Sequence, residues 1–194
     1  MKQIGRKLYH LVGGVGLLSV YFIFGRKPAL IFYAAFFILI LLIDGARLAV
    51  PAWNRFVFTR FPSFIRKNEE HRLTGTAPYV LGIGLSLTAY STPIASAAIC
   101  FLAFGDVAAT AIGERYGRTK IKSKSLEGTL AFIVAAAVSG FLLSLLGVHL
   151  PIWVMFLGVL AAAGVELLTL PVNDNLLIPL VSGGIMELAL RMAG

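Results

Sequence analysis

The segment RTKIKSKSLEGTL, residues 118–130, places a dense cluster of charge directly before a long apolar stretch. A solvated loop would explain its lysines, but not the Ser125-Leu126-Glu127-Gly128 sequence that leads straight into a run of nearly uncharged residues. The composition of the rest of the chain indicates the class of protein in which this segment lies. Its cationic side chains are those of Arg118, Lys120, Lys122 and Lys124.

The composition is that of an integral membrane protein. Of the 194 residues, 58% are hydrophobic and 13% are charged, whereas soluble domains have about 45–50% and about 25%. The net charge of +8 does not indicate nucleic acid, because lysines and arginines in such a chain more often set membrane topology. The single cysteine, Cys100, excludes a disulfide framework. The first apolar stretch resembles a signal peptide but lacks a small-residue cleavage site before Gly25-Arg26-Lys27, so we expect a retained helix.

The hydrophobic stretches predict an all-α membrane protein. A transmembrane helix needs about 20 apolar residues, and we predict a bundle of about seven such helices that forms one membrane-embedded domain over residues 1–194. Small residues in the fourth to sixth stretches favour close helix packing. The sequence leaves the oligomeric state open. The predicted helices are residues 8–24, 28–50, 76–91, 93–116, 127–148, 151–170 and 175–192.

The positions of the cations predict the orientation, because lysine and arginine accumulate in cytoplasmic loops. A cytoplasmic N-terminus leaves only Arg26, Lys27 and Arg191 of the 17 cations on the outer side. We expect residues 51–75 to form an interfacial segment, with an amphipathic helix that breaks near Pro62. A loop with aromatic anchors, or a gate for a lipid, are the alternatives. The cations expected inside are Lys2, Arg6, Lys7, Arg47, Arg55, Arg60, Arg66, Lys67, Arg72, Arg115, Arg118, Lys120, Lys122 and Lys124.

Seven of the nine acidic residues lie within or against the apolar stretches. A carboxylate in a bilayer costs a few kcal/mol, so each needs a partner or a function. With the predicted orientation, most lie at cytoplasmic helix ends, and Asp106 lies about 13 Å deeper along its helix than Arg115. The polar groups thus converge beneath the lysine-rich loop. The seven residues are Asp44, Asp106, Glu114, Glu127, Glu166, Asp174 and Glu187.

Some of these polar residues have a structural explanation. Asp44 and Arg47 are three residues apart, and Glu187 and Arg191 are four apart, so each pair can neutralise itself on one helix face. We expect His10 to be a satisfied interfacial side chain rather than a ligand.

Asp106 and Glu166 have no basic residue one helical turn away. Together with Asp174, they need a partner from elsewhere in the fold. Magnesium is one such partner, since it binds one or two carboxylates together with substrate phosphates.

The opening segment predicts an anion site. Ser125 is a plausible N-cap, and a helix N-terminus beside four cations is suited to phosphate. A basic loop opposite buried acids indicates phosphoryl or nucleotidyl transfer, which depends on positioning and charge neutralisation. The run GDVAATAIGERYG, residues 105–117, matches neither a Walker A motif nor a dinucleotide fingerprint.

Five segments together resemble the membrane CTP-dependent lipid kinases, which include dolichol kinase, phytol kinase and the CTP-dependent diacylglycerol kinase. They are RKLYH (6–10), EEHRLTGTAPY (69–79), GDVAATAIGERYG (105–117), KSKSLEGTLAF (122–132) and ELLTLPVNDNLLIP (166–179). The resemblance implies that residues 120–128 belong to a CTP-binding loop, and that Asp106 and Asp174-Asn175 line the phosphoryl-transfer site. The related phosphatidate cytidylyltransferase shares the Lys-x-x-Glu-Gly element but ends in an Asp-Arg signature, where this chain has Asp174-Asn175.

We therefore predict a kinase that moves the γ-phosphate of CTP to a membrane lipid alcohol with Mg²⁺, at the cytoplasmic face. The expected acceptor is an isoprenoid alcohol such as a polyprenol, dolichol or phytol, with diacylglycerol next. The alternatives are a cytidylyltransferase that acts on a lipid phosphate and, as a non-enzyme, a small transporter. The nucleotide site is expected to comprise Gly105, Gly117, Lys120, Lys122, Lys124, Ser125, Glu127 and Gly128. The expected catalytic residues are Asp106, Glu166 and Lys124, the metal ligands Asp106 and Asp174, and the other lining residues His10 and Asn175.

Overall fold

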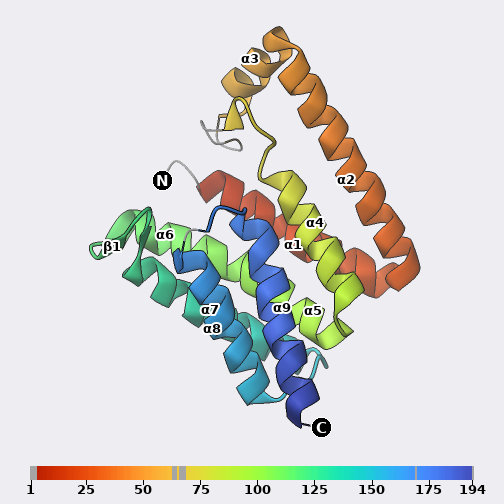
Figure 1. The fold of residues 1–194 in the computed structure, drawn as a ribbon, viewed down its shortest axis with the longest axis vertical. Coiled ribbons are helices and arrows are strands. Elements are labelled where there is room, and N and C mark those ends of the chain that lie inside the picture. Colours follow the sequence, from red (N-terminus) through yellow and green to blue (C-terminus); the bar gives the residue numbers. More distant parts are fainter. Residues whose placement is uncertain (1–3, 63–64, 66–68, 169, 194) are drawn as a thin grey trace.

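A computed structural model of the chain describes residues 4–62, 65, 69–168 and 170–193, and shows a bundle of helices with one small hairpin (Figure 1). In chain order the elements are α1 (Ile4–Phe24), α2 (Arg26–Ala49), α3 (Pro51–Arg60), α4 (Thr76–Ala89), α5 (Thr92–Cys100), the π-helical turn η2 (Phe101–Gly105), α6 (Asp106–Tyr116), β1 (Lys120–Ile121), β2 (Lys124–Ser125), α7 (Leu126–Leu145), α8 (Ile152–Leu168) and α9 (Asp174–Ala193).

Each of the seven predicted apolar stretches forms a helix, which confirms the helical bundle. Among the described residues, five segments are long and apolar enough to cross a membrane. The other two, α4 and α8, have 14 and 17 residues, or about 21 and 26 Å at 1.5 Å per residue. They are shorter than the hydrocarbon core of about 30 Å, so seven full spans remain a prediction. The five candidate spans are Gly5–Phe24, Arg26–Ala49, Thr92–Tyr116, Leu126–Leu145 and Asp174–Ala193.

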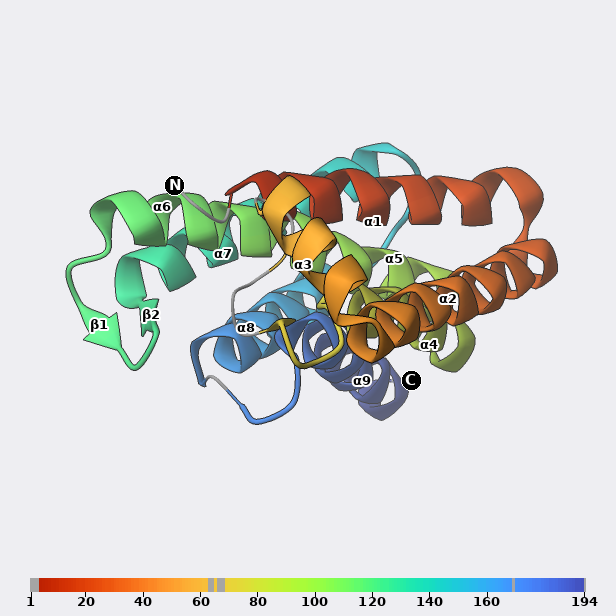
Figure 2. The same cartoon turned by 90° about the horizontal axis from the view of Figure 1, so that it is seen from above.

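The segment Thr92–Tyr116 is the centre of the bundle. It is 72% buried, whereas the other four candidate spans are 22–39% buried. Small residues such as Ala95 and Ala98 have no exposed surface and let neighbouring helices approach closely. Helices α7 and α9 pack against this segment and α1 runs alongside it, while α8 packs on α7 and α9, and α2 packs on α4 at the edge of the bundle (Figures 1 and 2).

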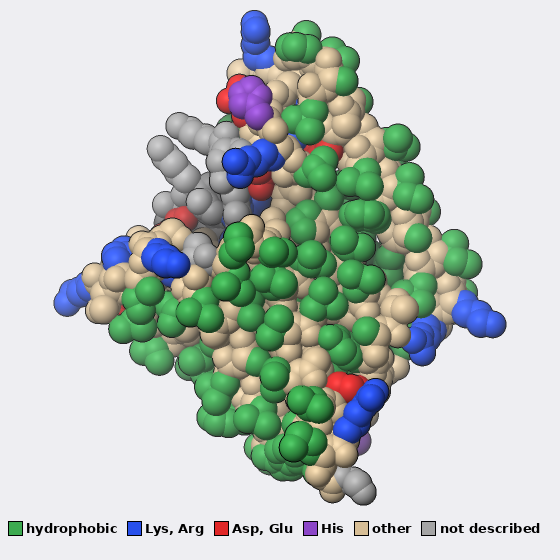
Figure 3. Space-filling view, in the orientation of Figure 1, with side chains coloured by type: hydrophobic (Ala, Val, Ile, Leu, Met, Phe, Trp, Pro, Cys, Tyr) green, Lys and Arg blue, Asp and Glu red, His purple; other side chains and the backbone are tan. Residues whose placement is uncertain are grey.

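The outer surface is compatible with lipid. Hydrophobic side chains cover most of the face shown in Figure 3, and lysine and arginine lie at its edges. Many large apolar residues on the helices are exposed, among them Val12, Ile31 and Leu42. In a bilayer these side chains contact lipid tails.

The π-helical turn η2 comes immediately before Asp106. Single π turns within α-helices are frequent at functional sites. A Cβ atom at Gly105 would lie 2.7–2.8 Å from the ring of Phe132 in α7. Gly105 therefore allows the ring of Phe132 to pack closely against the turn that precedes Asp106, and its predicted place in the nucleotide site stays a prediction.

A network around Arg47 holds the 69–75 segment against α2. Arg47 Nε lies 3.2 Å from Asp44 Oδ1, and its other nitrogens donate to Asn54 and to the Glu69 and Arg72 carbonyl oxygens. The predicted Asp44–Arg47 pair is confirmed. The predicted Glu187–Arg191 pair is also confirmed, at 3.3 Å.

Helix α3 begins at Pro51 and ends at Arg60, which agrees with the predicted helix that breaks near Pro62. Trp53 and Phe56 stack at 5.3 Å on its exposed surface. Placement of this helix in the interface remains a prediction. Other residues used in the sequence argument, Lys2, Arg66 and Lys67, lie outside the described part of the chain.

The loop over residues 117–128 contains a β-hairpin, which the all-helical prediction missed. Lys120 pairs with Ser125, and Ile121 pairs with Lys124. Lys122 has a φ of 53° at the tip. Two-residue strands are too short to leave a hydrophobic alternation in the sequence, so only the structure reveals them.

Candidate active site at one end of the bundle

Buried polar side chains from five helices or helix ends meet at the end of the bundle that carries the β-hairpin. The first turns of α1, α6, α7 and α9 and the last turn of α8 supply them. The N-terminus, the hairpin and the start of α9 lie on the same side of the molecule in Figure 1. We call Lys7, Asp106, Lys124, Glu166 and Asp174 the acid–lysine cluster.

Lys7 of α1 forms a buried ion pair with Asp106 Oδ2. Asp106 was expected to need a partner from elsewhere in the fold, and Lys7, 99 residues away in the sequence, is that partner. Asp106 Oδ1 is also buried and has no hydrogen-bond partner in the described part of the chain. One carboxylate oxygen is thus neutralised by Lys7, while the other remains able to accept a bond.

Lys124 joins the two other acids of the cluster. Its Nζ lies 2.8 Å from Glu166 Oε1 and 3.5 Å from Asp174 Oδ2. The hydroxyl of Thr129, one turn into α7, donates to Glu166 Oε2 at 3.0 Å. Glu166 is therefore held by a cation and a hydroxyl from the same loop–helix junction.

The two sets of contacts form one electrostatic unit. Burial alone would lower the pKa of Lys124, but the carboxylates of Asp174, Glu166 and Asp106 together raise it above its ordinary value of 10.5. Asp174 also interacts electrostatically with Lys7. Lys124 therefore carries its charge at neutral pH, and a change at one member of the cluster affects the others.

The start of α7 has the predicted N-cap. Ser125 Oγ accepts a hydrogen bond from the Gly128 backbone N–H at 3.2 Å, which satisfies one of the free donors of the first turn. Two glycines lie close to this serine. A Cβ at Gly117 would lie 2.6 Å from Ser125 Oγ, and a Cβ at Gly128 would lie 2.8 Å from the backbone oxygen of Ala109. Gly117 and Gly128 therefore allow α6 and α7 to meet around Ser125.

Glu127, in the first turn of α7, forms hydrogen bonds to the segment that leads into the hairpin. Its carboxylate accepts hydrogen bonds from the Thr119 backbone N–H at 3.0 and 3.3 Å, and the Leu126 N–H donates to the Thr119 oxygen. In this structure Glu127 fixes the path of the chain into the hairpin.

The three hairpin lysines are not equivalent. Successive side chains of a strand point to opposite faces, and Lys124 pairs with Ile121 whereas Lys120 pairs with Ser125. Lys124 accordingly turns toward the carboxylates. Lys120 and Lys122 are exposed, and Lys120 Nζ lies 3.4 Å from the Gly113 oxygen.

Asn175 connects the cluster with α4. Its Nδ2 donates to the Gly75 oxygen at 3.1 Å, while its Oδ1 is buried without a hydrogen-bond partner among the described residues. The Gly75 N–H donates to Glu69 Oε1 at 3.1 Å. His10 stacks on the Tyr79 ring at 4.5 Å. The predicted lining residues His10 and Asn175 thus both lie near Gly75.

The donor set fits a magnesium ion that is bound together with a nucleotide. In residues 4–62, 65, 69–168 and 170–193, no three His, Cys, Asp or Glu side chains are grouped to hold a metal by themselves. Magnesium usually takes only one or two protein carboxylates and completes its shell with phosphate and water. The unused Oδ1 of Asp106 and the carboxylate of Asp174 match that requirement.

Two contributors to this site escaped the sequence analysis. Lys7 lies three residues before His10 and therefore on the same helix face. Because His10 was a predicted lining residue, this spacing could have placed Lys7 in the site as well. Thr129 lies four residues after the N-cap Ser125 and is similarly placed. Neither the Lys7–Asp106 nor the Thr129–Glu166 contact can be read from local spacing.

The fold and site define a multi-pass helical membrane protein with buried, paired charges at one end. Comparison with known proteins adds the family. The CTP-dependent diacylglycerol kinase 1 of Saccharomyces cerevisiae is 28% identical over 145 residues, which cover 71% of this chain and 49% of that protein. The probable chloroplastic phytol kinase of Zea mays is 30% identical over 203 residues, or 93% of this chain and 65% of that protein.

A probable chloroplastic phytol kinase 1 of Glycine max is 32% identical over 152 residues, or 73% of this chain and 47% of that protein. The chain spans about half the length of several of these relatives. No protein-family model matches the chain, and no solved structure matches it. The chain is therefore a relative of the CTP-dependent lipid kinases, and the resemblance seen in its motifs is confirmed.

Proposed function

We propose that this protein is a kinase that transfers the γ-phosphate of CTP to the hydroxyl of a membrane lipid alcohol. The observation that carries the proposal is the acid–lysine cluster, which places three carboxylates and two lysines beside a cationic hairpin at one end of a membrane bundle. Phosphoryl transfer requires this combination, because cations must neutralise phosphate oxygens while carboxylates hold metal and orient the acceptor.

In the proposed step, the hydroxyl oxygen of the lipid forms a bond to the γ-phosphorus. The bond from that phosphorus to the oxygen that bridges to the β-phosphate breaks, and CDP leaves. The hydroxyl proton is accepted by a carboxylate and passes to water. Glu166 is suited to orient the hydroxyl, since its Oε1 becomes available when Lys124 turns to the phosphates.

Lys124 would exchange its carboxylate partners for phosphate oxygens when nucleotide binds. Lys7 and Lys124 neutralise Asp106 and Glu166, which offsets the cost of burying these two acids. With the triphosphate present, Lys124 would turn to its oxygens, and Asp106 and Asp174 would hold magnesium, which supplies charge neutralisation to the phosphates. Lys120 and Lys122 on the exposed hairpin would attract the nucleotide from the aqueous side.

The braced hairpin positions this nucleotide site. Ser125, Glu127, Gly117 and Gly128 fix the junction of the hairpin and α7 through the contacts described above. They would act as positioning residues, whereas Lys124 would contact the phosphates directly. An isoprenoid alcohol is the proposed acceptor, with diacylglycerol as the second choice.

Transfer of label from CTP tests the proposal. The purified protein in mixed micelles receives magnesium, phytol or diacylglycerol, and CTP labelled at either the α- or the γ-phosphate. We expect γ-label and no α-label in the extracted lipid, and weaker transfer from ATP, GTP or UTP. Appearance of the α-label would identify a cytidylyltransferase, and absence of label from every lipid tested would contradict both activities.

A further inference from the structure

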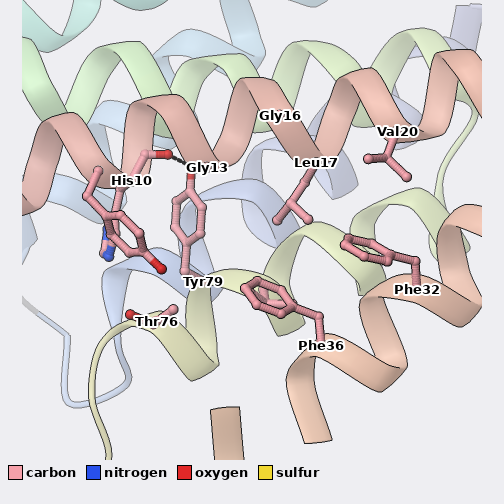
Figure 4. A pocket seen from close by; sticks show the side chains of 11 residues that line it. His10, Gly13, Gly16, Leu17, Val20, Phe32, Phe36, Thr76 and Tyr79 are labelled. Atoms are coloured by element: carbon pink, nitrogen blue, oxygen red, sulfur yellow. Dashed lines mark hydrogen bonds between the residues drawn. The ribbon is translucent and has the colours of Figure 1, made fainter. Parts of the chain in front are cut away.

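An apolar groove lies between α1, α2 and α4 (Figure 4). Its cavity has a volume of about 350 Å³. The middle and far part are lined by hydrophobic side chains, among them Leu17, Val20, Phe32 and Phe36, and the near end by the polar side chains of His10, Thr76 and Tyr79. The groove therefore has one polar end and one apolar end.

The geometry of α1 and α2 produces this groove. The two helices meet at a turn at Gly25, which has a φ of 80°, and α2 then packs on α4 at the edge of the bundle (Figure 1). On α1, Gly13 and Gly16 line the groove, and a Cβ at either would meet nothing within 4 Å. At Gly14 a Cβ would instead collide with the Tyr79 hydroxyl. Gly14 thus serves packing, while Gly13 and Gly16 leave open space.

The groove continues toward the other end of the bundle. A second cavity of about 370 Å³ is lined by Val20, Phe24, Pro28 and Phe32, and it shares Val20 and Phe32 with the first. From His10 to Phe24 the helix axis extends about 21 Å. That is about two thirds of a hydrocarbon core of about 30 Å, so a hydrocarbon chain could lie along α1 over most of one bilayer crossing.

The polar end of the groove adjoins the acid–lysine cluster. The Tyr79 hydroxyl donates to the backbone oxygen of His10 at 2.5 Å. This hydroxyl lies beside Gly14, where an added Cβ would also lie 3.2 Å from Ala103 Cβ. Ala103 comes three residues before Asp106 in the sequence. A Cβ at Gly75 would lie 3.3 Å from Asn175 Nδ2 and 3.9 Å from His10 Cε1. His10 and Asn175 therefore both lie beside Gly75, and the Asn175 Oδ1 is buried without a hydrogen-bond partner in the described chain.

We infer that this groove binds the acceptor lipid alcohol, with its hydrocarbon chain against Leu17, Val20, Phe32 and Phe36 and its hydroxyl at the His10 end. A lipid alcohol matches the groove because it is apolar along its length and polar at one end. The inference rests on the proposed function and adds to it the place from which the acceptor reaches the cluster.

Filling the groove at Gly16 tests the inference. Gly16 lines the groove and a Cβ there would meet nothing within 4 Å, so the ring of a Phe at this position would extend into the groove. We expect Gly16→Phe to raise the KM for phytol by about tenfold or more, the order of discrimination that a hydrophobic pocket achieves, and to leave the KM for CTP unchanged. Gly45→Phe is the matched control, since Gly45 of α2 also has nothing within 4 Å and does not line the groove. An unchanged KM for phytol in Gly16→Phe would overturn the assignment.

Photolabelling provides a readout that is independent of activity. Phytol with a diazirine at its chain terminus should label residues of α1 and α2 in the wild type and in Gly45→Phe, and labelling should be lost in Gly16→Phe. Competition by unlabelled phytol and by diacylglycerol distinguishes the two acceptors. Groove labelling that Gly16→Phe abolishes, in a protein without kinase activity, would support the lipid site and reject the kinase. Labelling that is insensitive to Gly16→Phe would reject the lipid site whatever the activity.

Discussion

Asp106 is the residue on which the proposed chemistry depends most directly. It follows a π-helical turn, its Oδ2 is paired with Lys7, and its Oδ1 is buried without a partner in the described chain. Considered without Lys7, Asp106 is an unpaired acid, and a change to Asn should ease its burial. The ion pair reverses that expectation for stability, because Asn would leave the Lys7 charge uncompensated.

We predict that Asp106→Asn abolishes turnover and lowers the free energy of unfolding. Breaking a buried ion pair typically costs about 3–5 kcal/mol. Replacing both partners, in Lys7→Met with Asp106→Leu, should recover much of the stability, because apolar replacements of a buried pair are often neutral. It should not recover turnover. Thermal unfolding in detergent and CTP-dependent phosphorylation are the measurements, and an active double variant would limit the pair to a structural role.

Lys124 and Lys120 form a matched pair of lysines on opposite faces of the hairpin. Lys124→Ala should weaken CTP binding by about 10- to 150-fold, the loss of one charge-assisted contact worth about 1.5–3 kcal/mol. Lys120→Ala should have a smaller effect, because its side chain is exposed and faces away from the carboxylates. Binding of a fluorescent CTP analogue measures both. Equal losses of CTP affinity in the two variants would show that the hairpin lysines attract the nucleotide through their total charge, without a specific contact from Lys124.

The pKa of Lys124 also predicts a pH dependence. Because its carboxylate partners raise this pKa above 10.5, the lysine is fully charged at lower pH, and its contribution to stability is complete there. The contribution is lost as the pH rises above 10.5 through the higher folded-state pKa. Wild type and Lys124→Met should therefore differ by a constant amount in unfolding temperature from pH 7 to 10. A difference that disappears within this range would contradict the ion-pair assignment.

Among the elements, the hairpin and the start of α7 are coupled by close packing. Gly113, Gly117 and Gly128 have no side chains where α6, α7 and Ser125 meet. The sequence predicted the N-cap, since a serine before Glu-Gly and an apolar run is a local signal. It could not predict the hairpin or the π turn, because neither leaves a periodic pattern.

We predict that Gly117→Ala weakens CTP binding without loss of helix content. The added Cβ would meet the Gly113 oxygen and Ser125 Oγ, and overpacking of this kind costs about 1–3 kcal/mol. The strain should displace the hairpin, which is less constrained than the helices. Gly45→Ala is the control, since a Cβ at Gly45 meets nothing within 4 Å. Circular dichroism and CTP titration decide the outcome. Normal CTP affinity in Gly117→Ala would separate hairpin packing from nucleotide binding.

At the scale of the whole molecule, the lengths of the hydrophobic stretches predicted where the long helices begin and end. They predicted little about which residues of different helices contact one another. The seven apolar stretches became helices within a few residues of their expected ends. The pairing of Lys7 with Asp106 joins residues 99 apart and depends on how α1 packs alongside the central segment. Local periodicity carries no information on such packing, so the sequence indicated that Asp106 needs a partner from elsewhere in the fold but not that Lys7 is this partner.

The predicted orientation places the hairpin on the cytoplasmic side. A single cysteine at Lys122 should be labelled by a membrane-impermeant maleimide only from the inner face, and one at Lys27 only from the outer face. The native Cys100 is buried and should not react. The reverse pattern would place the acid–lysine cluster on the side opposite to cytoplasmic CTP.

The most direct measurement is the mass balance of one reaction. Wild-type protein in proteoliposomes receives CTP, magnesium and phytol, and mass spectrometry quantifies the lipid product together with the nucleotide released. The account predicts a lipid that has gained one phosphate group, with CDP in equal amount, and neither product above background in Asp106→Asn. A lipid that carries cytidine, or CDP released without any phosphorylated lipid, would contradict it.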